Sequence, residues 1–384
     1  MTLPSRFVSR LSLLSWPLGF GLIRRHKQQG GQVRVLWVAS TYLDIVVGSQ
    51  EFAGETPPER TPYTIVDGVA GASTECSGHL GSAGMHPLAK ANMCALGRKV
   101  GKMIITFLGT AAAEAYPDAF CRCENCERAR ELGGPSLRKR SAALINDDLL
   151  IDLGPDIMTA SFMHGRSLAR VRYCLQTHAH ADHLDPSHLL SRSPEYGVAD
   201  APRLHFYAST ATARRAAQLL ERDCAPASLL DPEVGERLNL EIHQIEALQS
   251  FTVGPYQVTA FPANHDPTVD PLLYAVEADG RSIFYGTDTA MLPEETWGAF
   301  HRHELRFDVV ILDHTYGPDE TGSDHLSAQQ FIEHVARMRD EGLLADGARA
   351  FATHVAHAGN SVHPELADFA ALRGYEVAYD GLTV

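Results

Sequence analysis

The sequence predicts a layered α/β fold for residues 103–384 and a separate segment for residues 1–102. In the longer part, short apolar runs alternate with stretches of helical character, which is typical of strands covered by helices. Histidine and aspartate follow closely after the ends of several of these runs. Because α/β proteins build their sites at the carboxyl ends of strands, this pattern predicts both a fold and a site on its rim.

The expected elements can be followed along the chain. Met103–Thr110 is an apolar run that ends in a glycine turn, and Leu144–Gly154 holds two short runs around Asn-Asp-Asp, which predicts a β-hairpin. Val171–Gln176 predicts a strand, and Thr210–Glu221 and Gln329–Arg339 predict helices. Further apolar runs predict strands at 257–261, 281–286, 308–312 and 348–352. A length of about 280 residues is ample to bury two sheets.

The first 102 residues have a different character. They carry a net charge of +5, whereas the remainder carries −19, and they contain glycine-, serine- and threonine-rich stretches. The apolar run Leu11–Ile23 is too short to span a membrane. We expect residues 1–102 to be a poorly structured N-terminal extension or a misannotated leader, and residues 103–384 to form the main domain. The alternative is a small domain with Val33–Val47 as its strand-like part.

Four potential metal ligands lie within six residues just after the run Val171–Gln176, namely His178, His180, Asp182 and His183. Side chains two residues apart in an extended segment point the same way, so His178 and His180 can converge on one ion. Asp182 and His183 lie where we expect the chain to turn into a helix, and they can face a second ion. Imidazole and carboxylate ligands suit zinc, manganese or iron rather than calcium. The alternative is a histidine-rich surface loop.

Further candidate ligands recur after later strands. His265, Asp288 and His354 each follow closely on an apolar run. Any one of them alone would more often be a structural histidine or a helix-capping aspartate. Their recurrence at strand ends favours a shared metal centre.

The order of these motifs closely resembles that of the metallo-β-lactamase superfamily, in which H-x-H-x-D-H is followed by histidine, aspartate and histidine. The resemblance implies a four-layer αββα sandwich that holds two divalent ions, zinc or manganese. It assigns the first ion to His178, His180 and His265. It assigns the second ion to Asp182, His183 and His354. Asp288 would bridge both ions, and Asp182 is also counted among the catalytic residues.

Two adjacent ions imply hydrolysis. A hydroxide that bridges ions about 3.5–4 Å apart is a nucleophile near neutral pH, and the ions stabilise the oxygens of a displacement at phosphorus. Asp152 and Gly154 are similar to the superfamily's D-x-G motif. This likeness implies that Asp152 orients a ligand histidine from behind, whereas a solvated aspartate at a strand end is the alternative.

A second cluster places three thiols, Cys121, Cys123 and Cys126, within six residues. Three thiolates lack one ligand for a closed tetrahedral zinc site, and His357 is the natural fourth because it lies three residues after His354. The prediction is a Cys₃His structural zinc. The alternatives are reduced cysteines in a loop or a disulfide pair, which the cytosol disfavours.

Joined to H-x-x-H, the C-x-C-x-x-C motif resembles the phosphoribosyl cyclic phosphodiesterases of phosphonate breakdown, the accessory proteins of carbon–phosphorus lyase. In these enzymes and in the related tRNA 3′-processing nucleases, a histidine at the place of His325 assists catalysis. This implies that His325 protonates the leaving oxygen or holds a phosphoryl oxygen. The alternative is that Ser327 caps a helix and His325 is a solvated loop residue.

The remaining histidines carry less weight. His314 follows a strand and could line the cleft. Surface or structural positions are the simplest interpretation of six further histidines, which are His188, His243, His301, His303, His334 and His363. The pair Arg214-Arg215 is interpreted as part of a solvated helix face.

These observations favour a phosphoric diester hydrolase that acts on a small phosphodiester such as a cyclic ribose phosphate. The acidic main domain argues against a large nucleic-acid surface. We expect a cytoplasmic enzyme of phosphonate metabolism without membrane contact, and a homodimer by analogy. The alternatives are a tRNA 3′-processing endonuclease and an accessory protein of cofactor biosynthesis similar to pyrroloquinoline-quinone protein B, which shares C-x-C-x-x-C.

Overall fold

The computed structural model describes residues 103–384 except Asp319 and Thr321, together with the backbone of four N-terminal strands. The chain divides into two units, Met1–Ala89 and Lys90–Val384. In the first unit, four antiparallel strands pair in the order β1 (Leu13–Ser15), β2 (Phe20–Lys27), β3 (Gln32–Thr41) and β4 (Asp44–Ala53). The expectation of an extension or leader over residues 1–102 falls largely outside the described residues, and it stays a prediction.

Six strands form the first sheet of the second unit. In spatial order they are β10 (Leu240–Gln244), β9 (Leu204–Ala208), β8 (Tyr173–Leu175), β7 (Leu149–Ile151), β6 (Ala142–Ile145) and β5 (Ile105–Gly109). Strands β7 to β10 run parallel, and β5 and β6 run antiparallel to their neighbours. The expected hairpin is the pair β6–β7, with Asn146 at its turn in the left-handed region (φ 50°), which asparagine tolerates.

Seven strands form the second sheet. In spatial order they are β11 (Ser250–Val253), β12 (Tyr256–Pro262), β13 (Leu272–Ala278), β14 (Arg281–Gly286), β15 (Phe307–Asp313), β16 (Leu344–Thr353) and β17 (Glu376–Val377). The pairs from β11 to β14 are antiparallel, and those from β14 to β17 are parallel. Every strand expected from an apolar run therefore lies in one of the two sheets.

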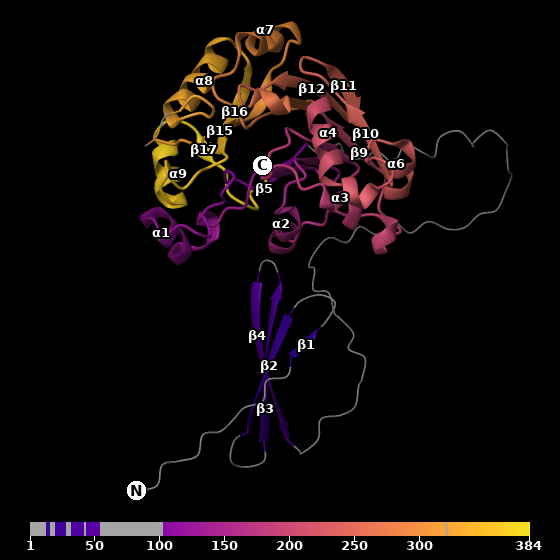
Figure 1. Cartoon of the computed structure of the whole chain (residues 1–384). Coiled ribbons are helices and arrows are strands. Elements are labelled where there is room, and N and C mark those ends of the chain that lie inside the picture. The colour runs from indigo at the N-terminus through magenta and orange to yellow at the C-terminus, as the bar shows by residue number, and fades with distance from the viewer. Residues whose placement is uncertain are drawn as a thin grey trace, which may run out of the picture. The chain divides into compact units, whose positions relative to one another are not determined.

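Helices cover the outer face of each sheet (Figure 1). On the first sheet lie α2 (Ile157–His164), α3 (Ser187–Ser191), α4 (Thr210–Leu219), α5 (Glu221–Cys224) and α6 (Pro232–Leu238). On the second sheet lie α7 (Glu294–Arg302), α8 (Ala328–Asp340) and α9 (His363–Ala371). The helix α1 (Glu124–Leu132) adds Ala129 to the core of this second side.

The cores show why strand β15 is apolar at successive positions. Alternate side chains of a strand point to opposite faces of the sheet. Val310 and Leu312 pack toward α7, α8 and α9, whereas Val309 and Ile311 pack between the two sheets. Both faces are buried, as in other sheets covered on two sides. The predicted four-layer αββα sandwich is confirmed.

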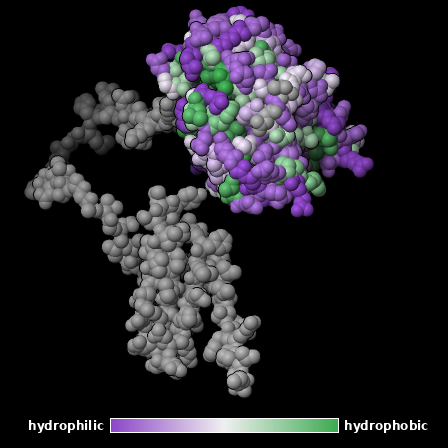
Figure 2. Space-filling view, turned by 90° about the vertical axis from the view of Figure 1, so that its left-hand side faces the viewer, coloured by the Kyte–Doolittle hydropathy of each residue, from purple (hydrophilic) through white to green (hydrophobic). Residues whose placement is uncertain are grey.

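Helix α8 begins at a capping box. The Ser327 hydroxyl accepts from the amide of Gln330, and the Gln330 side chain accepts from the amide of Ser327. This arrangement satisfies two amides that the helix leaves unpaired. Figure 2 views the side that carries α8 and α9, where hydrophilic residues cover most of the surface. In the described part of the chain, no helix combines the length and apolar character needed to cross a membrane.

Candidate metal centre

The loops that follow four strands bring the expected ligands together. His178 and His180 follow β8, His265 follows β12, Asp288 follows β14 and His354 follows β16. The expected helix at Asp182 and His183 is wrong, because these residues lie in a turn and α3 begins only at Ser187. The turn directs both side chains inward, and both are buried.

The candidate ligands form two groups, each with donor atoms within 4.8 Å of one another. The first group consists of His178, His180 and His265. The second group consists of Asp182, His183, Asp288 and His354.

Asp288 lies close to histidines of both groups. Its Oδ2 lies 3.6 Å from His178 Nε2 and 3.9 Å from His265 Nε2, both in the first group. The same atom lies 3.2 Å from His183 Nε2, and its Oδ1 lies 2.8 Å from His354 Nε2. One carboxylate thus stands between the two sets of imidazoles.

The donor spacing fits a small metal ion. A tetrahedral zinc with bonds of about 2.0–2.2 Å holds its ligand atoms about 3.3–3.6 Å apart. His183 Nε2 lies 3.1 Å from Asp182 Oδ2 and 3.4 Å from His354 Nε2, and the latter lies 3.5 Å from the same Asp182 oxygen. In the first group, His265 Nε2 lies 3.2 Å from His180 Nδ1. Ions could therefore occupy these positions with little rearrangement.

One buried atom supports this fit directly. His178 is fully buried, and its Nε2 has no hydrogen-bond partner. Its Nδ1 contacts Thr177 Oγ1 at 3.0 Å, which fixes the ring orientation. An unpaired buried nitrogen is costly, so the arrangement is expected only where a further group satisfies it. A metal ion beside Asp288 would do so.

Each of the other candidate histidines also has a partner on its second ring nitrogen. Metal-binding histidines are usually oriented by a partner on the ring nitrogen away from the metal. Asp152 contacts His183 Nδ1 at 2.7 Å, and Asp266 contacts His180 Nε2 at 3.3 Å. The corresponding contacts are from Thr315 Oγ1 to His354 Nδ1 at 2.8 Å and from the Asp324 carbonyl to His265 Nδ1 at 3.2 Å.

The motif D-x-G positions the loop that bears the first ligands. Asp152 is fully buried with φ 66°, and its Oδ1 accepts from the amide and hydroxyl of Thr177 at 2.8 Å. A β-carbon on Gly154 would lie 2.8 Å from the carbonyl oxygen of Asp182, so only glycine allows this approach. A non-glycine residue at positive φ is uncommon, and such strain concentrates at functional sites. Asp152 thus lies behind His183, where the superfamily resemblance placed it.

The buried carboxylates of the centre need positive charge close to them. Burial opposes ionisation of Asp288, but His183 and His354 outweigh it and hold its pKa well below the usual range. Burial also disfavours the charged form of His354, yet attraction to Asp288 outweighs it and raises the pKa of His354 to about 10. Protons on the histidines thus balance the buried carboxylates. Bound metal ions would supply this positive charge instead.

His325 lies at the edge of the same centre. Its Nδ1 lies 2.8 Å from Asp313 Oδ2, and its ring stacks on that of His354 with centroids 5.3 Å apart. Burial opposes its charged form, but Asp313 outweighs it and raises the pKa of His325. One ring nitrogen of His325 lies within 4.8 Å of a carboxylate oxygen of Asp288.

Asp313 is the residue that sequence reasoning missed. It ends strand β15, is fully buried, and also accepts from the amide and hydroxyl of Thr315. Its position at a strand end was the available signal. The neighbouring His314, considered for the cleft, instead bonds Asn360 and Tyr375 in the core.

The thiol cluster forms a separate group away from this centre. Cys121, Cys123, Cys126 and His357 have donor atoms within 4.8 Å of one another. His357 Nδ1 lies 3.4 Å from Cys123 Sγ and 3.9 Å from Cys121 Sγ. The amide of Cys126 donates to Cys123 Sγ at 3.4 Å, as Cys123 caps α1. Burial opposes ionisation, but this amide and neighbouring side chains outweigh it and lower the pKa of Cys123 to about 7. The group therefore has the composition and spacing of a Cys₃His site.

A groove of about 1010 Å³ opens beside the first ligand group. His180 and Asp266 lie at one part of its wall, and Arg214 and Arg215 of α4 lie at another. Both arginines are exposed. The two arginines therefore lie on an exposed helix face, as expected, and this face also borders the groove.

Comparison with known families decides the fold family. A family described as Beta-lactamase superfamily domain matches residues 148–355, which is more than half of the chain. The chain belongs to the metallo-β-lactamase superfamily. Members of this superfamily are mostly metal-dependent hydrolases. The resemblance drawn from H-x-H-x-D-H is confirmed.

Solved structures agree with this fold. A diphosphatase from the PhnP family is 20% identical, with a TM-score of 0.57 over 74% of this chain and 97% of that chain. Zinc-bound PqqB from Methylobacterium extorquens is 19% identical, with a TM-score of 0.53 over 73% and 99%. YhfI from Bacillus subtilis is 17% identical, with a TM-score of 0.52 over 73% and 98%. The comparison with curated proteins gave no match.

Proposed function

We propose that this protein is a phosphodiesterase that uses two divalent ions, zinc or manganese, to hydrolyse a small phosphodiester. The first ion would be held by His178, His180 and His265. The second would be held by Asp182, His183 and His354. Asp288 would bind both.

The position of Asp288 carries this proposal. Its two oxygens approach histidines of both groups, at 2.8 Å for His354 and 3.6 Å for His178. A carboxylate in this position holds two ions close together without leaving a buried negative charge unbalanced. A single-ion centre would not need a second group of imidazoles around the same carboxylate.

The chemistry follows from the residues that surround the reacting phosphorus. When bound, two such ions supply a nucleophile near neutral pH and neutralise charge on the phosphoryl oxygens. A water oxygen, with one proton released to solvent, would form the new bond to phosphorus as the bond from phosphorus to the leaving oxygen breaks. His325, held at Nδ1 by Asp313, donates the proton that the leaving oxygen takes up. Asp313 keeps that ring protonated and oriented.

The surroundings favour a small anionic substrate. Arg214 and Arg215 border the groove beside His180, where they can attract a second anionic group of the substrate. The net charge of −19 over residues 103–384 opposes a large nucleic-acid surface. A cyclic ribose phosphate fits these conditions better than a precursor tRNA. A diphosphate ester is a further candidate, because one structural relative is described as a diphosphatase.

The thiol cluster is proposed to hold a structural zinc. Three thiols and one imidazole complete a tetrahedral set, which leaves no open position for a substrate. The Asn125 side chain donates to the carbonyl oxygens of His357 and Asn360, at 2.9 and 3.0 Å. The zinc would therefore join helix α1 to the loop that follows His354. Location in the cytoplasm and assembly as a homodimer stay predictions.

The test compares substrates on one enzyme preparation. Bis-(p-nitrophenyl) phosphate, a cyclic ribose phosphate, a diphosphate ester and a precursor tRNA are incubated with the protein and added manganese or zinc. We expect metal-dependent release from the small diesters and little cleavage of the tRNA. His178→Ala should abolish turnover, whereas the surface variant His303→Ala should retain it, which excludes a contaminating phosphatase. Preferential tRNA cleavage, or no metal-dependent turnover of any small diester, would refute the proposal.

A further inference from the structure

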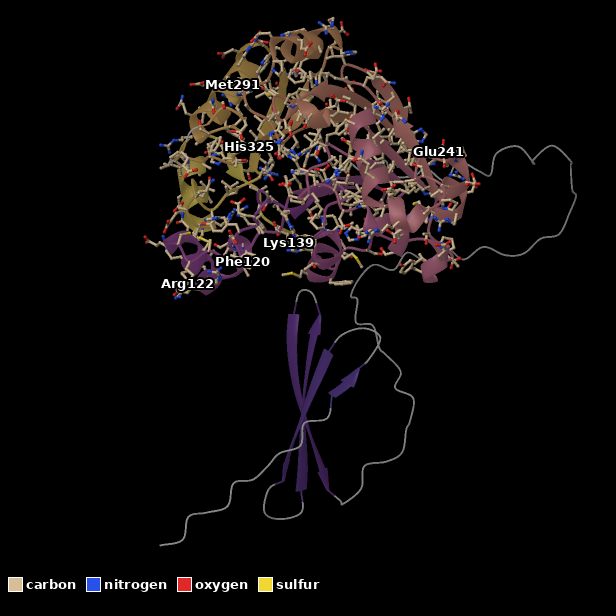
Figure 3. The ribbon with its side chains drawn as sticks, viewed as in Figure 1. Phe120, Arg122, Lys139, Glu241, Met291 and His325 are labelled. Carbon is tan, nitrogen blue, oxygen red and sulfur yellow. The ribbon has the colours of Figure 1, made fainter. Side chains whose placement is uncertain are left out.

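A third cluster of metal-binding side chains lies at the edge of the first sheet. His205 is on β9, and Glu241 and His243 are on the edge strand β10. The parallel register places Glu241 opposite His205, and His243 follows two residues later on the same face. In Figure 3, Glu241 lies on the far side of the domain from His325. The cluster is therefore separate from the proposed active centre.

The donor atoms of this cluster already have the spacing of a metal site. His205 Nδ1 lies 3.1 Å from His243 Nε2 and 3.5 Å from Glu241 Oε2. His243 Nε2 lies 3.6 Å from Glu241 Oε1. Three ligands of a tetrahedral ion with bonds of about 2.0–2.2 Å lie about 3.3–3.6 Å apart. All three separations agree with this value to within a few tenths of an ångström, and each carboxylate oxygen of Glu241 faces one of the two imidazoles.

Aromatic packing holds the two rings in place. His243 stacks on Tyr207 with centroids 4.4 Å apart and an angle of 12°, and it also stacks on His205. Tyr173 packs against the His205 ring at 5.8 Å. The imidazoles are thus oriented before any ion arrives, which reduces the entropy that binding would cost. About a third of each imidazole and half of the Glu241 side chain remain exposed, so an ion can enter from solvent.

The nearest cation does not fill the position. Arg203 lies 3.6 Å from Glu241, but both of its terminal nitrogens bond to Glu236, at 3.2 and 2.8 Å. Its charge is therefore largely balanced by Glu236. Glu241 remains able to neutralise an ion held by the two histidines.

We propose that His205, Glu241 and His243 bind one divalent transition-metal ion, zinc being the best match, at a surface site distinct from the catalytic and thiol clusters. Two imidazoles and one carboxylate form a set that zinc uses when a fourth position stays open. That position would face solvent and hold water. The ion would link β9 to the edge strand β10, so its binding should raise the stability of the folded chain.

The alternative is that the cluster is only a hydrogen-bonded group. In that case, one ring donates a proton to the other across the 3.1 Å between His205 Nδ1 and His243 Nε2, and Glu241 stays solvated. Metal binding separates the two interpretations, because only the first requires all three side chains.

The experiment measures zinc uptake by calorimetry and by elemental analysis after dialysis. It starts from protein supplied with only enough zinc to fill the catalytic and thiol clusters, so that the third cluster is still open. His243→Phe removes the nitrogen but keeps a ring that can stack on Tyr207, and Glu241→Gln keeps the shape but removes the charge. The matched control is His301→Ala with His303→Ala, because these exposed histidines also form H-x-H but belong to no cluster of possible ligands in the described residues.

We expect the wild type to take up one more zinc ion per chain than His243→Phe. Glu241→Gln should bind it at least about tenfold more weakly, because losing a ligand should cost no less than losing an outer partner. Zinc should also raise the melting temperature of the wild type and the control, but not of His243→Phe. Diesterase activity should be unchanged in all variants, so a failure here is distinguishable from a failure of the proposed function. Equal zinc uptake by wild type and both cluster variants, or equal loss in the control, would overturn the proposal.

Discussion

The buried His/Asp centre and the thiol cluster differ in how their side chains are held. In the centre, a second hydrogen-bond partner fixes each candidate histidine, and His178, His183 and His354 are almost fully buried. In the thiol cluster, Cys121, Cys123 and His357 are only half-buried and lie on loops beside α1. The centre is therefore built by the fold before metal arrives, whereas metal would complete the thiol cluster.

Two ligand sets in one chain can therefore have opposite relations to folding. In a site built in advance, part of the free energy of folding is used to fix the geometry that catalysis requires. In a site completed by its ion, metal binding adds to the free energy that stabilises the fold. Single substitutions should separate these roles.

The largest effect is expected for Asp288→Asn. The change keeps the shape but removes the charge shared by the two groups, so at least one ion should leave the centre. Turnover should fall by more than the roughly 10²–10³-fold that one oxyanion-stabilising donor contributes. Elemental analysis and diester hydrolysis measure this directly. Metal in the thiol cluster should be retained, and full occupancy of the centre with normal turnover would contradict a shared role for Asp288.

His325→Ala should lower turnover by roughly 10²–10⁴-fold without loss of metal. A general acid must be protonated, so wild-type kcat should fall as pH rises through the pKa of His325. Asp313 raises that pKa, which places the fall above the ordinary histidine range near pH 6.5. The pH profile of the variant should lack this limb. A variant that loses metal, or keeps the limb, would show that His325 has another role.

Asp152→Asn should have a smaller effect, because Asp152 touches the ligand His183 and not the ion. Loss of such an outer partner typically costs about 10–100-fold in metal affinity. Equilibrium dialysis against a metal buffer measures the affinity, and excess metal should restore most of the turnover. Unchanged affinity would mean that Thr177 and the surrounding loop hold the centre without this carboxylate.

His357→Ala should change turnover least. One ion fewer should bind, and the melting temperature should fall because the link between α1 and the loop after His354 is lost. Activity of the protein that remains folded should stay near that of the wild type at low temperature. The same metal content as the wild type would refute the zinc assignment, and a loss of turnover with full stability would point to a catalytic part for the cluster.

Much of this fold could be predicted because local patterns were strong. Strand β15 is apolar at successive positions, since both of its faces are buried, and the motif beginning at His178 follows a strand end. The turn at Asp182 could not be predicted from local sequence, because it packs closely against Gly154, which belongs to a distant part of the chain. Asp313 was missed because its role depends on a contact with His325 across 12 residues of chain.

The cluster on β9 and β10 shows the same limit more sharply. His243 was interpreted as structural, and His205 lies 38 residues earlier in the chain. Only the parallel register of two neighbouring strands brings them together. Spacing along the sequence reveals ligands that share a loop, but it does not reveal ligands that share a sheet edge.

Electron paramagnetic resonance of the manganese-loaded protein tests whether Asp288 holds two ions together. Two ions that share the Asp288 carboxylate should give the spectrum of a spin-coupled pair, and Asp288→Asn should lose that coupling. A wild-type spectrum of isolated manganese ions, or binding of a single ion to the centre, would contradict the shared carboxylate on which the proposed hydrolysis depends.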